Sequence, residues 1–346
     1  MQQKKVSIKD IANEIGTSIT TVSLILNGKG EERKISKSLI EKVLKVVEEK
    51  NYQPNLLAKS LRTGKTNTIA LMVEDISNQF FSQVAGLVDE LAGKMGYKLL
   101  YSSTENDPVR TRELIDLFMA RHVDGFIICP PEESLAEIES LAKNNIPLVL
   151  FDRYFPDHPF NHVVVDNYMG TRDSVRHLVK NGYKNIAFIT LESNQTQMKE
   201  RLNGYLEVIE ENKFDPHIYT LSYTSKEGET VISDMIAYFK SIPKLDAVFF
   251  ATNYLGVKGI EVIKTMKKEI GKQIGVVSFD DHDLFRLYSP SISAIAQPTK
   301  AIAESIIEVL LHQMNKSKSN GEVERIKIPT QITIRDSSKK DYVPFP

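Results

Sequence analysis

The stretch SIKDIANEIGTSITTVSLILNG, residues 7–28, decides how the beginning of this chain folds. Ser7 and Asp10 have the Ser-x-x-Asp spacing of a capping box, and apolar side chains then recur at helical spacing. Gly16 interrupts this pattern, and Ser18 can cap a second short helix. The stretch therefore predicts two helices joined by a tight turn.

A third amphipathic helix is expected from about Ser36, with one apolar face that covers the first two helices. The side chains expected on that face are Leu39, Ile40, Val43, Leu44 and Val47. Two helices that meet across a glycine-containing turn have the geometry that places the second helix in the major groove of DNA. A small helical bundle that binds nothing is the alternative.

The distribution of charge favours DNA binding by this segment. Residues 1–66 contain 13 Lys or Arg and 7 Asp or Glu, a net charge of +6, whereas the whole chain of 346 residues has a net charge of -1. The remainder therefore carries -7. A basic segment attached to an acidic one indicates that the basic segment meets a polyanion.

Composition limits the other classes of function. A hydrophobic fraction of 41% over 346 residues is typical of two or three folded domains. The single cysteine, Cys129, excludes an internal disulfide, and the seven histidines have no metal-ligand spacing, so neither a metal nor a cofactor is expected. No signal peptide or membrane-spanning run is found, which predicts a cytoplasmic protein without a membrane partner.

From Thr68 onward, short β-branched runs alternate with amphipathic helical stretches, which predicts an α/β fold with parallel strands and crossover helices. The runs are TIALMV, YKLLYSS, DGFIIC, PLVLFD, NIAFIT, HIYTLSY, DAVFFA and IGVVSF. They form two sets that separate near residues 162–167, so we expect two similar open sheets. A helix from about Thr299 to Asn315 follows, and RIKIPTQITI fits strands that return across a hinge.

Ligands of open α/β sheets bind beyond the carboxyl ends of the strands. The side chains found there are Ser77, Asn78, Phe80, Phe81, Asp152, Arg153, Asn253, Asp280, Asp281 and Gln297, with Arg201 on a nearby helix. Aromatic faces can pack on a sugar ring while planar polar groups bind its hydroxyls. Purely structural roles are the alternative for these residues. Phe80 and Phe81 could be core residues, Asp152 and Arg153 could form a surface ion pair, and Asp280 and Asp281 could cap the following helix.

The segments IKDIANEIGTSITTVSLILNG and NYQPNLLAKSLRTGKTNTIALMVEDISNQFF resemble the lactose-repressor (LacI/GalR) family of bacterial transcription regulators, and the resemblance covers essentially the whole chain. It implies a three-helix helix-turn-helix head, a short hinge helix and a two-subdomain body like the periplasmic sugar-binding proteins. The implied divisions are 1–50 for DNA binding, 51–66 for the hinge helix and linker, 67–164 plus 297–328 for one subdomain, and 165–296 plus 329–346 for the other.

The resemblance also implies which residues meet DNA. Ile19 and Thr20 fall where the family reads bases, whereas Leu24 stands where an arginine is usual and could touch a thymine methyl group. Leu61 falls where the hinge helix drives a leucine between base pairs in the minor groove. The full set expected at DNA is Ser18, Ile19, Thr20, Thr21, Ser23, Leu24, Asn27, Asn55, Ala58, Leu61 and Arg62.

The effector cleft implied by the resemblance uses eight of the residues at the strand ends, Arg201, and a tenth residue that departs from the family. Tyr254 stands where an aspartate usually follows Asn253, and it could stack on a ligand or line the wall. The full set expected in the cleft is Asn78, Phe80, Phe81, Asp152, Arg153, Arg201, Asn253, Tyr254, Asp280 and Gln297.

Together these features predict a regulator of transcription that is not an enzyme. We expect a repressor that binds a pseudo-palindromic operator in double-stranded DNA as a homodimer, with a tetramer left open. A small sugar or sugar derivative would release or modulate it. The alternative is the same DNA-binding regulator with a non-sugar effector such as a purine, or in a form that depends on a co-repressor. The helix-turn-helix and the lack of a signal peptide argue against an exported sugar-binding protein. An enzyme acting on a sugar would need a catalytic group.

Overall fold

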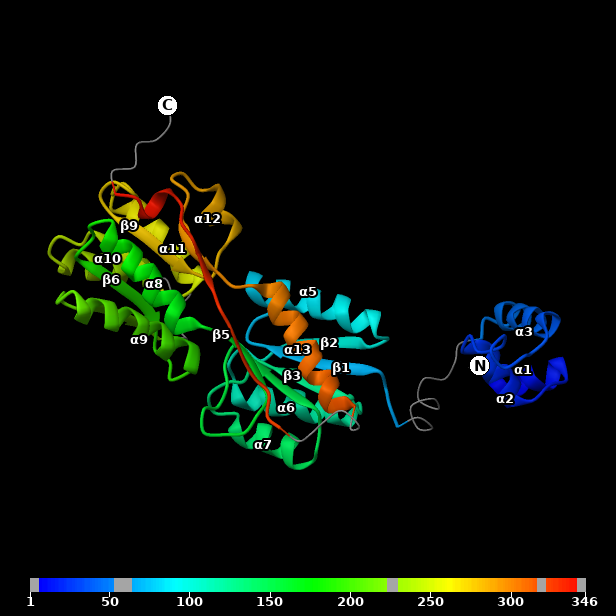
Figure 1. Cartoon of the computed structure of the whole chain (residues 1–346). Helices are drawn as coiled ribbons and strands as arrows, with labels where there is room; N and C mark the ends of the chain where they lie inside the picture. Colours follow the sequence, from blue (N-terminus) through cyan, green and yellow to red (C-terminus); the bar gives the residue numbers. More distant parts are fainter. Residues whose placement is uncertain (1–5, 53–63, 223–229, 316–321, 341–346) are drawn as a thin grey trace. The chain divides into compact units, whose positions relative to one another are not determined.

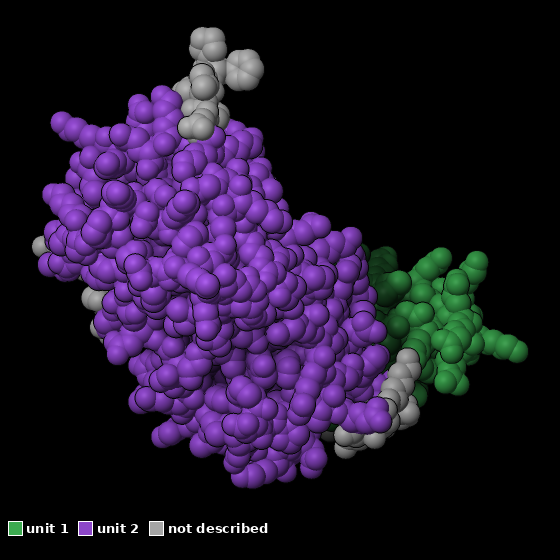
Figure 2. Space-filling view, turned by 60° about the vertical axis from the view of Figure 1, so that its left-hand side comes forward, with its two compact units in different colours: residues 1–66 green, residues 67–346 purple. Residues whose placement is uncertain are grey.

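The computed structural model describes residues 6–52, 64–222, 230–315 and 322–340. The chain separates into two compact units, residues 1–66 and 67–346, which are coloured separately in Figure 2. We call the described part of the first unit up to Tyr52 the head, and the second unit the body. Each is described by itself.

The head is a three-helix unit whose helix ends form as the sequence predicts. Its helices are α1 (Ile8–Ile15), α2 (Ile19–Leu26) and α3 (Lys37–Glu49). The backbone nitrogen of Ser7 donates to Asp10 Oδ2 at 2.8 Å, and the nitrogen of Asp10 donates to Ser7 Oγ at 3.3 Å, which completes the capping box. Gly16 ends α1 in the left-handed conformation, with φ 75°. Ser18 caps α2 through the nitrogen of Thr21 at 3.0 Å.

The core of the head is small, and it corrects one prediction. Its buried apolar side chains are Ile11, Ala12, Ile15, Val22, Ile25 and Val43. Leu44, which we expected to cover the first two helices, is 47% exposed. One residue is about 100° of rotation on a helix, so Leu44 lies beside the inward stripe centred on Val43 and not within it.

The body contains two six-stranded sheets, each parallel over most of its width (Figure 1). The first sheet has the order β11-β5-β4-β3-β1-β2. Its strands are β1 (Thr68–Val73), β2 (Lys98–Ser103), β3 (Gly125–Ile128), β4 (Leu148–Phe151), β5 (His162–Val165) and β11 (Arg325–Ile328). Helices α5 (Gln79–Lys94) and α13 (Thr299–Met314) cover one face, and α6 (Pro108–Ala120) and α7 (Leu135–Lys143) cover the other.

The second sheet repeats this arrangement with the order β12-β10-β9-β8-β6-β7, in which β12 is antiparallel to β10. Its strands are β6 (Ile186–Leu191), β7 (His217–Leu221), β8 (Ala247–Phe250), β9 (Gly275–Phe279), β10 (Ser293–Ala296) and β12 (Gln331–Thr333). Its helices are α8 (Asn167–Lys180), α9 (Thr196–Glu211), α10 (Val231–Ser241), α11 (Asn253–Thr265) and the short α12 (Asp283–Leu287). The predicted alternation of strands and helices is confirmed.

The chain passes between the two sheets three times. It leaves the first sheet after β5, returns from β10 into α13, and crosses again between β11 and β12 (Figure 1). The last passage is short, because β11 ends at Ile328 and β12 begins at Gln331. Each half of the body therefore depends on residues near the end of the chain.

Close packing of α8 against α9 predicts a sensitive glycine. A Cβ atom at Gly204 would lie 2.5 Å from the carbonyl oxygen of Tyr168 and 3.0 Å from the backbone nitrogen of Arg172. Because these neighbours are backbone atoms, Gly204→Ala should lower the free energy of unfolding by about 1–3 kcal/mol, measured by urea denaturation. Gly86→Ala is the matched control: its Cβ meets nothing within 4 Å, so it should stabilise α5 by about 0.5–1 kcal/mol. Equal effects of the two variants would contradict this reading.

Candidate ligand cleft and DNA-binding head

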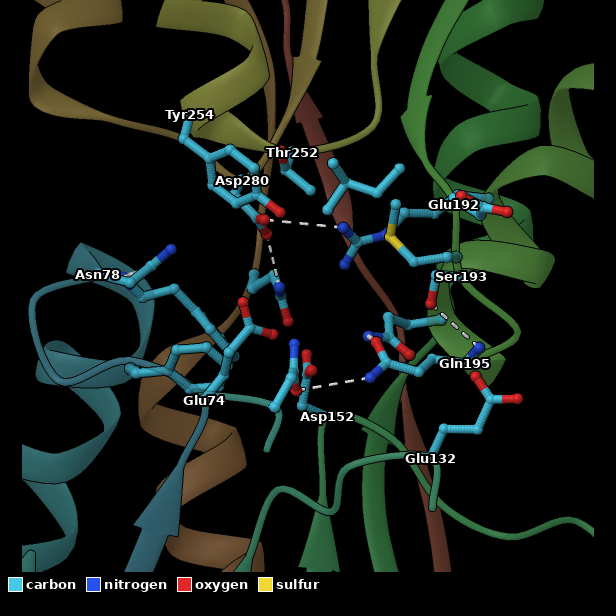
Figure 3. A pocket seen from close by; sticks show the side chains of 18 of the residues that line it. Glu74, Asn78, Glu132, Asp152, Glu192, Ser193, Gln195, Thr252, Tyr254 and Asp280 are labelled. Carbon is cyan, nitrogen blue, oxygen red and sulfur yellow. Dashed lines mark hydrogen bonds and ion pairs between the residues drawn. The ribbon is translucent and has the colours of Figure 1, made fainter. Parts of the chain in front are cut away.

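A cavity of about 270 Å³ opens where the strands of the two sheets end, and we call it the cleft (Figure 3). Glu74 directly follows β1, Asp152 follows β4 and Asp280 follows β9. Its lining residues are Glu74, Asn78, Phe80, Phe81, Asn106, Pro108, Glu132, Glu133, Asp152, Leu191, Glu192, Ser193, Gln195, Gln197, Met198, Arg201, Thr252, Tyr254, Asp280 and Gln297. The carboxyl ends of both sheets thus converge on one space, as open α/β sheets require of a ligand site.

Arg153 lies beneath the cleft and does not line it. Its side chain is 2% exposed, and its Nη2 atom lies 2.5 Å from Glu74 Oε2. Its Nη1 donates to Asn106 Oδ1 at 2.8 Å, its Nε donates to Cys129 Sγ at 3.1 Å, and Asp152 Oδ2 lies 3.5 Å from Nε. The guanidinium is therefore the centre of a buried network that joins the segments after β1, β2, β3 and β4.

Arg201 plays the corresponding part on the other side of the cleft. Its Nε donates to Asn167 Oδ1 at 2.9 Å and its Nη1 donates to the carbonyl oxygen of Ala251 at 2.7 Å. Nη1 also lies 3.7 Å from Asp280 Oδ2, and the guanidinium carbon lies 3.6 Å from the centre of the Phe279 ring. These contacts fix Arg201 against the end of the second sheet, where it can orient a ligand group.

The two strand-end aspartates share a geometry and an electrostatic environment. Asp152 and Asp280 adopt the left-handed conformation, with φ 66° and 64°, which aspartate tolerates better than most residues. Burial raises the pKa of each carboxyl group, and the neighbouring Arg153 and Arg201 oppose that rise. Gln297 Nε2 donates to Asp280 Oδ1 at 2.6 Å. Burial likewise raises the pKa of Tyr254.

The raised pKa of Asp152 gives a prediction with a definite sign. Folding favours the protonated form, so the stabilising contribution of Asp152 is complete below its ordinary pKa of 3.8 and is lost as the pH rises through the folded-state value. Asp152→Asn keeps a neutral side chain and should therefore unfold at higher urea concentration than the native protein at pH 7. The difference should vanish in acid. The exposed Asp157→Asn is the control and should stay within about 0.5 kcal/mol. Destabilisation by Asp152→Asn at pH 7 would mean that the Arg153 ion pair outweighs burial.

The paired aromatic side chains lie both in the core and at the lining of the cleft. Phe80 and Phe81 are 9% and 5% exposed and belong to the core of the first sheet, yet both also line the cleft. Their ring centres are 5.1 Å apart, and the ring centres of Phe81 and Phe151 are 6.1 Å apart in a T-shaped arrangement. They give the cleft one apolar wall that the core holds rigid.

The structure brings eight of the ten residues predicted for the cleft to its lining and leaves two outside it. Besides Arg153, Asn253 is absent from the lining: it is 4% exposed, begins α11, and accepts from the backbone nitrogen of Tyr254 at 2.8 Å through its own side chain. Asn253 thus supports the helix start, while its neighbours Thr252 and Tyr254 reach the cleft.

Sequence reasoning missed several polar residues of the lining. Glu74 and Thr252 lie at strand ends that we inspected, and Asn106 and Gln195 lie a few residues beyond β2 and β6. Gln195 Nε2 donates to Asn106 Oδ1 at 3.5 Å, which connects the two sides of the cleft. All four lie within four residues of a strand end, so position alone could have predicted them, although no motif sets them apart.

In the head, the start of α2 presents its side chains to solvent. Ser18, Ile19, Thr20 and Asn27 are exposed, with Ile19 at 45%, while Thr21, Ser23 and Leu24 are half-buried. Ser18 also caps the helix, and Asn27 Nδ2 donates to the carbonyl oxygen of Ser23 at 2.6 Å. Asn55, Ala58, Leu61 and Arg62, which the sequence assigns to DNA contacts, lie outside the described residues.

The chain matches two family models that correspond to the head and the body. Residues 7–55 match bacterial regulatory proteins of the lacI family, and residues 175–338 match a periplasmic binding protein-like domain. The chain belongs to the lacI family of bacterial regulatory proteins. Regulators of this family act on transcription by binding DNA. The predicted α/β fold with a helical head and two sheets flanked by helices is confirmed, whereas the expected hinge helix falls on residues 53–63, outside the described residues.

Relatives of this lacI-family protein match it from end to end. The ribose operon repressor of Halalkalibacterium halodurans is 29% identical over 333 residues, which are 96% of this chain and 97% of that one. The transcriptional regulator DegA of Bacillus subtilis is 27% identical over 340 residues, 96% and 98% of the two chains.

Solved structures share the fold of this lacI-family protein. The lac repressor dimer bound to operator and the anti-inducer ONPF superimposes with a TM-score of 0.83 at 22% identity, over 97% of this chain and 99% of that one. A LacI-family regulator from Enterococcus faecium with bound ribose gives 0.69 at 22% identity, over 78% and 98%.

Two further properties of the described residues in this lacI-family protein concern metals and membranes. Within residues 6–52, 64–222, 230–315 and 322–340, no three histidine, cysteine, aspartate or glutamate side chains are grouped to hold a metal ion. Across the same ranges, none of the helices is both long enough and apolar enough to traverse a lipid bilayer.

Proposed function

We propose that this protein is a repressor that binds a pseudo-palindromic operator as a homodimer. A small polyhydroxylated ligand in the cleft controls its affinity for that DNA. Residues 1–50 bind DNA in this proposal, residues 51–66 couple the two units, and the two halves of the body close on the ligand. The halves comprise residues 67–164 with 297–328, and 165–296 with 329–346.

One observation carries the proposal: the same chain has an exposed second helix in the head and a cleft whose side chains suit a ligand with hydroxyl groups. Phe80 and Phe81 offer an apolar wall that suits the C-H face of a sugar ring. Asp152, Asp280 and Arg201 offer fixed acceptors and a donor on the other walls. The names of a ribose operon repressor and a ribose-bound neighbour support a sugar ligand.

Control would follow from a difference in ligand affinity between two arrangements of the body. A ligand shifts an equilibrium only by its differential affinity for the two states. Gln195 and Asn106, from opposite sides of the cleft, are 3.5 Å apart, and Gln79 Nε2 donates to Asp283 Oδ2 at 3.3 Å across the same divide. Closure on a ligand would tighten such contacts and alter the spacing of the paired heads.

DNA binding can be tested without a defined operator sequence. Sites are selected from random duplex DNA by the native protein, and their affinity is then measured by gel retardation at two salt concentrations. Thr20→Ala should weaken binding about tenfold because Thr20 is an exposed residue at the start of the helix that meets base edges. Ser38→Ala, an exposed residue of α3, is the matched control and should leave affinity unchanged. Selection that enriches no sequence at low salt would overturn the proposal.

A further inference from the structure

The lining of the cleft is strongly acidic. Its carboxylates are Glu74, Glu132, Glu133, Asp152, Glu192 and Asp280. Arg201 is the one cationic side chain among the described residues that line it. Like charges gathered around a small space raise the local concentration of cations and lower that of anions.

Both nearby guanidinium groups already have anionic or carbonyl partners within the protein. Arg153 is enclosed by Glu74, Asn106 and Cys129 beneath the cleft, at the distances given above. Arg201 donates to Asn167 and to the carbonyl oxygen of Ala251, and it faces Asp280. A phosphate or carboxylate in the cleft would therefore meet six carboxylates and a single lining cation, Arg201, whose charge is already shared with Asp280.

Three of the carboxylates are exposed at one side of the cleft. In Figure 3, Glu132 and Glu192 lie on the side opposite Asn78, and Glu133 adjoins the first of them in the chain. Within the described residues, no ion pair joins Glu132, Glu133 or Glu192 to a lysine, arginine or histidine. This side of the cleft therefore offers negative charge that a ligand can neutralise.

A buried amide oxygen points independently to a ligand that donates hydrogen bonds. Gln197 lines the cleft and is 6% exposed, and its Oε1 atom accepts no hydrogen bond from the described residues. Its Nε2 is already used, since it donates to Gln195 Oε1 at 3.1 Å. The Oε1 atom of Gln297, also at the lining, likewise accepts none from the described residues. Buried acceptors of this kind are costly unless a donor reaches them.

We propose that the effector carries a protonated amine beside its hydroxyl groups, as an amino sugar does, and that the cleft rejects phosphorylated and carboxylated sugars. This inference rests on the proposed role of the cleft as the effector site. The sugar ring packs against Phe80 and Phe81. The ammonium group points toward the side formed by Glu132, Glu133 and Glu192, and donors of the ligand reach Gln197.

The test compares probes that differ mainly in charge. Thermal shift and calorimetric titration use D-glucosamine, which is cationic, N-acetyl-D-glucosamine and D-glucose, which are neutral, and D-glucose 6-phosphate, which is anionic. D-galactosamine and D-galactose form a second matched pair. We expect an amine to bind at least fivefold more tightly than its neutral partner, with this advantage reduced in high salt, because exposed ion pairs contribute about two- to fivefold each and are screened.

Variants of the exposed carboxylates locate the effect. Glu132→Gln, Glu133→Gln and Glu192→Gln together should remove most of the preference for the amine, because each ion pair contributes about two- to fivefold to it. Glu113→Gln, an exposed carboxylate of α6 outside the cleft, is the matched control and should keep it. Far-ultraviolet circular dichroism and the melting temperature show whether each variant is folded, and a triple variant that fails to fold is replaced by the three single variants.

Three results would overturn the inference: tighter binding of D-glucose 6-phosphate than of D-glucose, equal binding of the amines and their neutral partners, or no stabilisation by either amine at about 10 mM, where weak millimolar binding is still detected. Gel retardation of DNA tests the proposed function separately. A protein that binds selected DNA and releases it with a neutral or anionic ligand keeps the proposed function and loses this inference. A protein that retards no DNA loses the proposed function whatever the charge preference of the cleft.

Discussion

Arg153→Ala should lower the free energy of unfolding of the body by about 3–5 kcal/mol, because it leaves buried carboxylates without the guanidinium that balances them. Glu74 lies 2.5 Å from the Arg153 guanidinium and Asp152 lies 3.5 Å from it. The loss should appear in urea denaturation at pH 7. Binding in the cleft should fall as well, since Asp152 lines it and loses its support.

Two further variants make this result specific. Arg286→Ala removes an exposed arginine that is paired with Asp283 at 3.3 Å, and it should cost at most about 0.5 kcal/mol. Adding Glu74→Ala to Arg153→Ala should restore part of the lost stability, because the second change removes one of the charges that the first left unbalanced. A loss below about 1 kcal/mol for Arg153→Ala would show that the buried network does not hold the loops together.

Ile11→Ala should unfold the head and abolish sequence-specific DNA binding while the body stays folded. Ile11 is fully buried in a cluster of six buried apolar side chains within residues 6–52. Deletion of such a side chain costs about 2–5 kcal/mol, which is comparable with the whole stability of a unit this small. Affinity for selected DNA should fall by more than about a hundredfold, as 1.4 kcal/mol corresponds to a factor of ten.

Hydrogen exchange followed by mass spectrometry separates the two units in this experiment. Amides of α1, α2 and α3 should lose protection in Ile11→Ala, whereas those of β8 and β9 should keep it. Leu44→Ala is the matched control in the same head: Leu44 is 47% exposed, so its loss should leave both protection and DNA binding nearly unchanged. Loss of protection throughout the body would show that the two units unfold together.

Local signals in the sequence were sufficient for the helices of the head and for the class of the body. Capping residues such as Ser7 and Ser18 accept a hydrogen bond from a backbone nitrogen three residues later. A short stretch of sequence is therefore enough to predict where such a helix begins. Buried parallel strands are nearly continuous apolar runs, and all eight runs noted in the sequence contain strands of the two sheets.

The contacts that decide the cleft are long-range, and the sequence does not contain them locally. Asp152 and Arg153 are adjacent, which suggested a shared role, yet the first lines the cleft and the second is buried beneath it. Arg153 is drawn there by Glu74, which lies 79 positions away in the chain. Leu44 was misplaced for a different reason, because a helix of moderate length offers two overlapping apolar faces and only packing selects one.

The three passages of the chain between the sheets also constrain how the protein is made. On a ribosome the head emerges early and holds all the residues of its own core, so it can fold while synthesis continues. Neither half of the body can fold completely at that stage. The first sheet needs α13 and β11, and the second needs β12, which ends at Thr333. A nascent chain halted before Arg325 would thus display a finished head on an incomplete body. Synthesis must therefore pass Thr333 before both sheets of the body are complete.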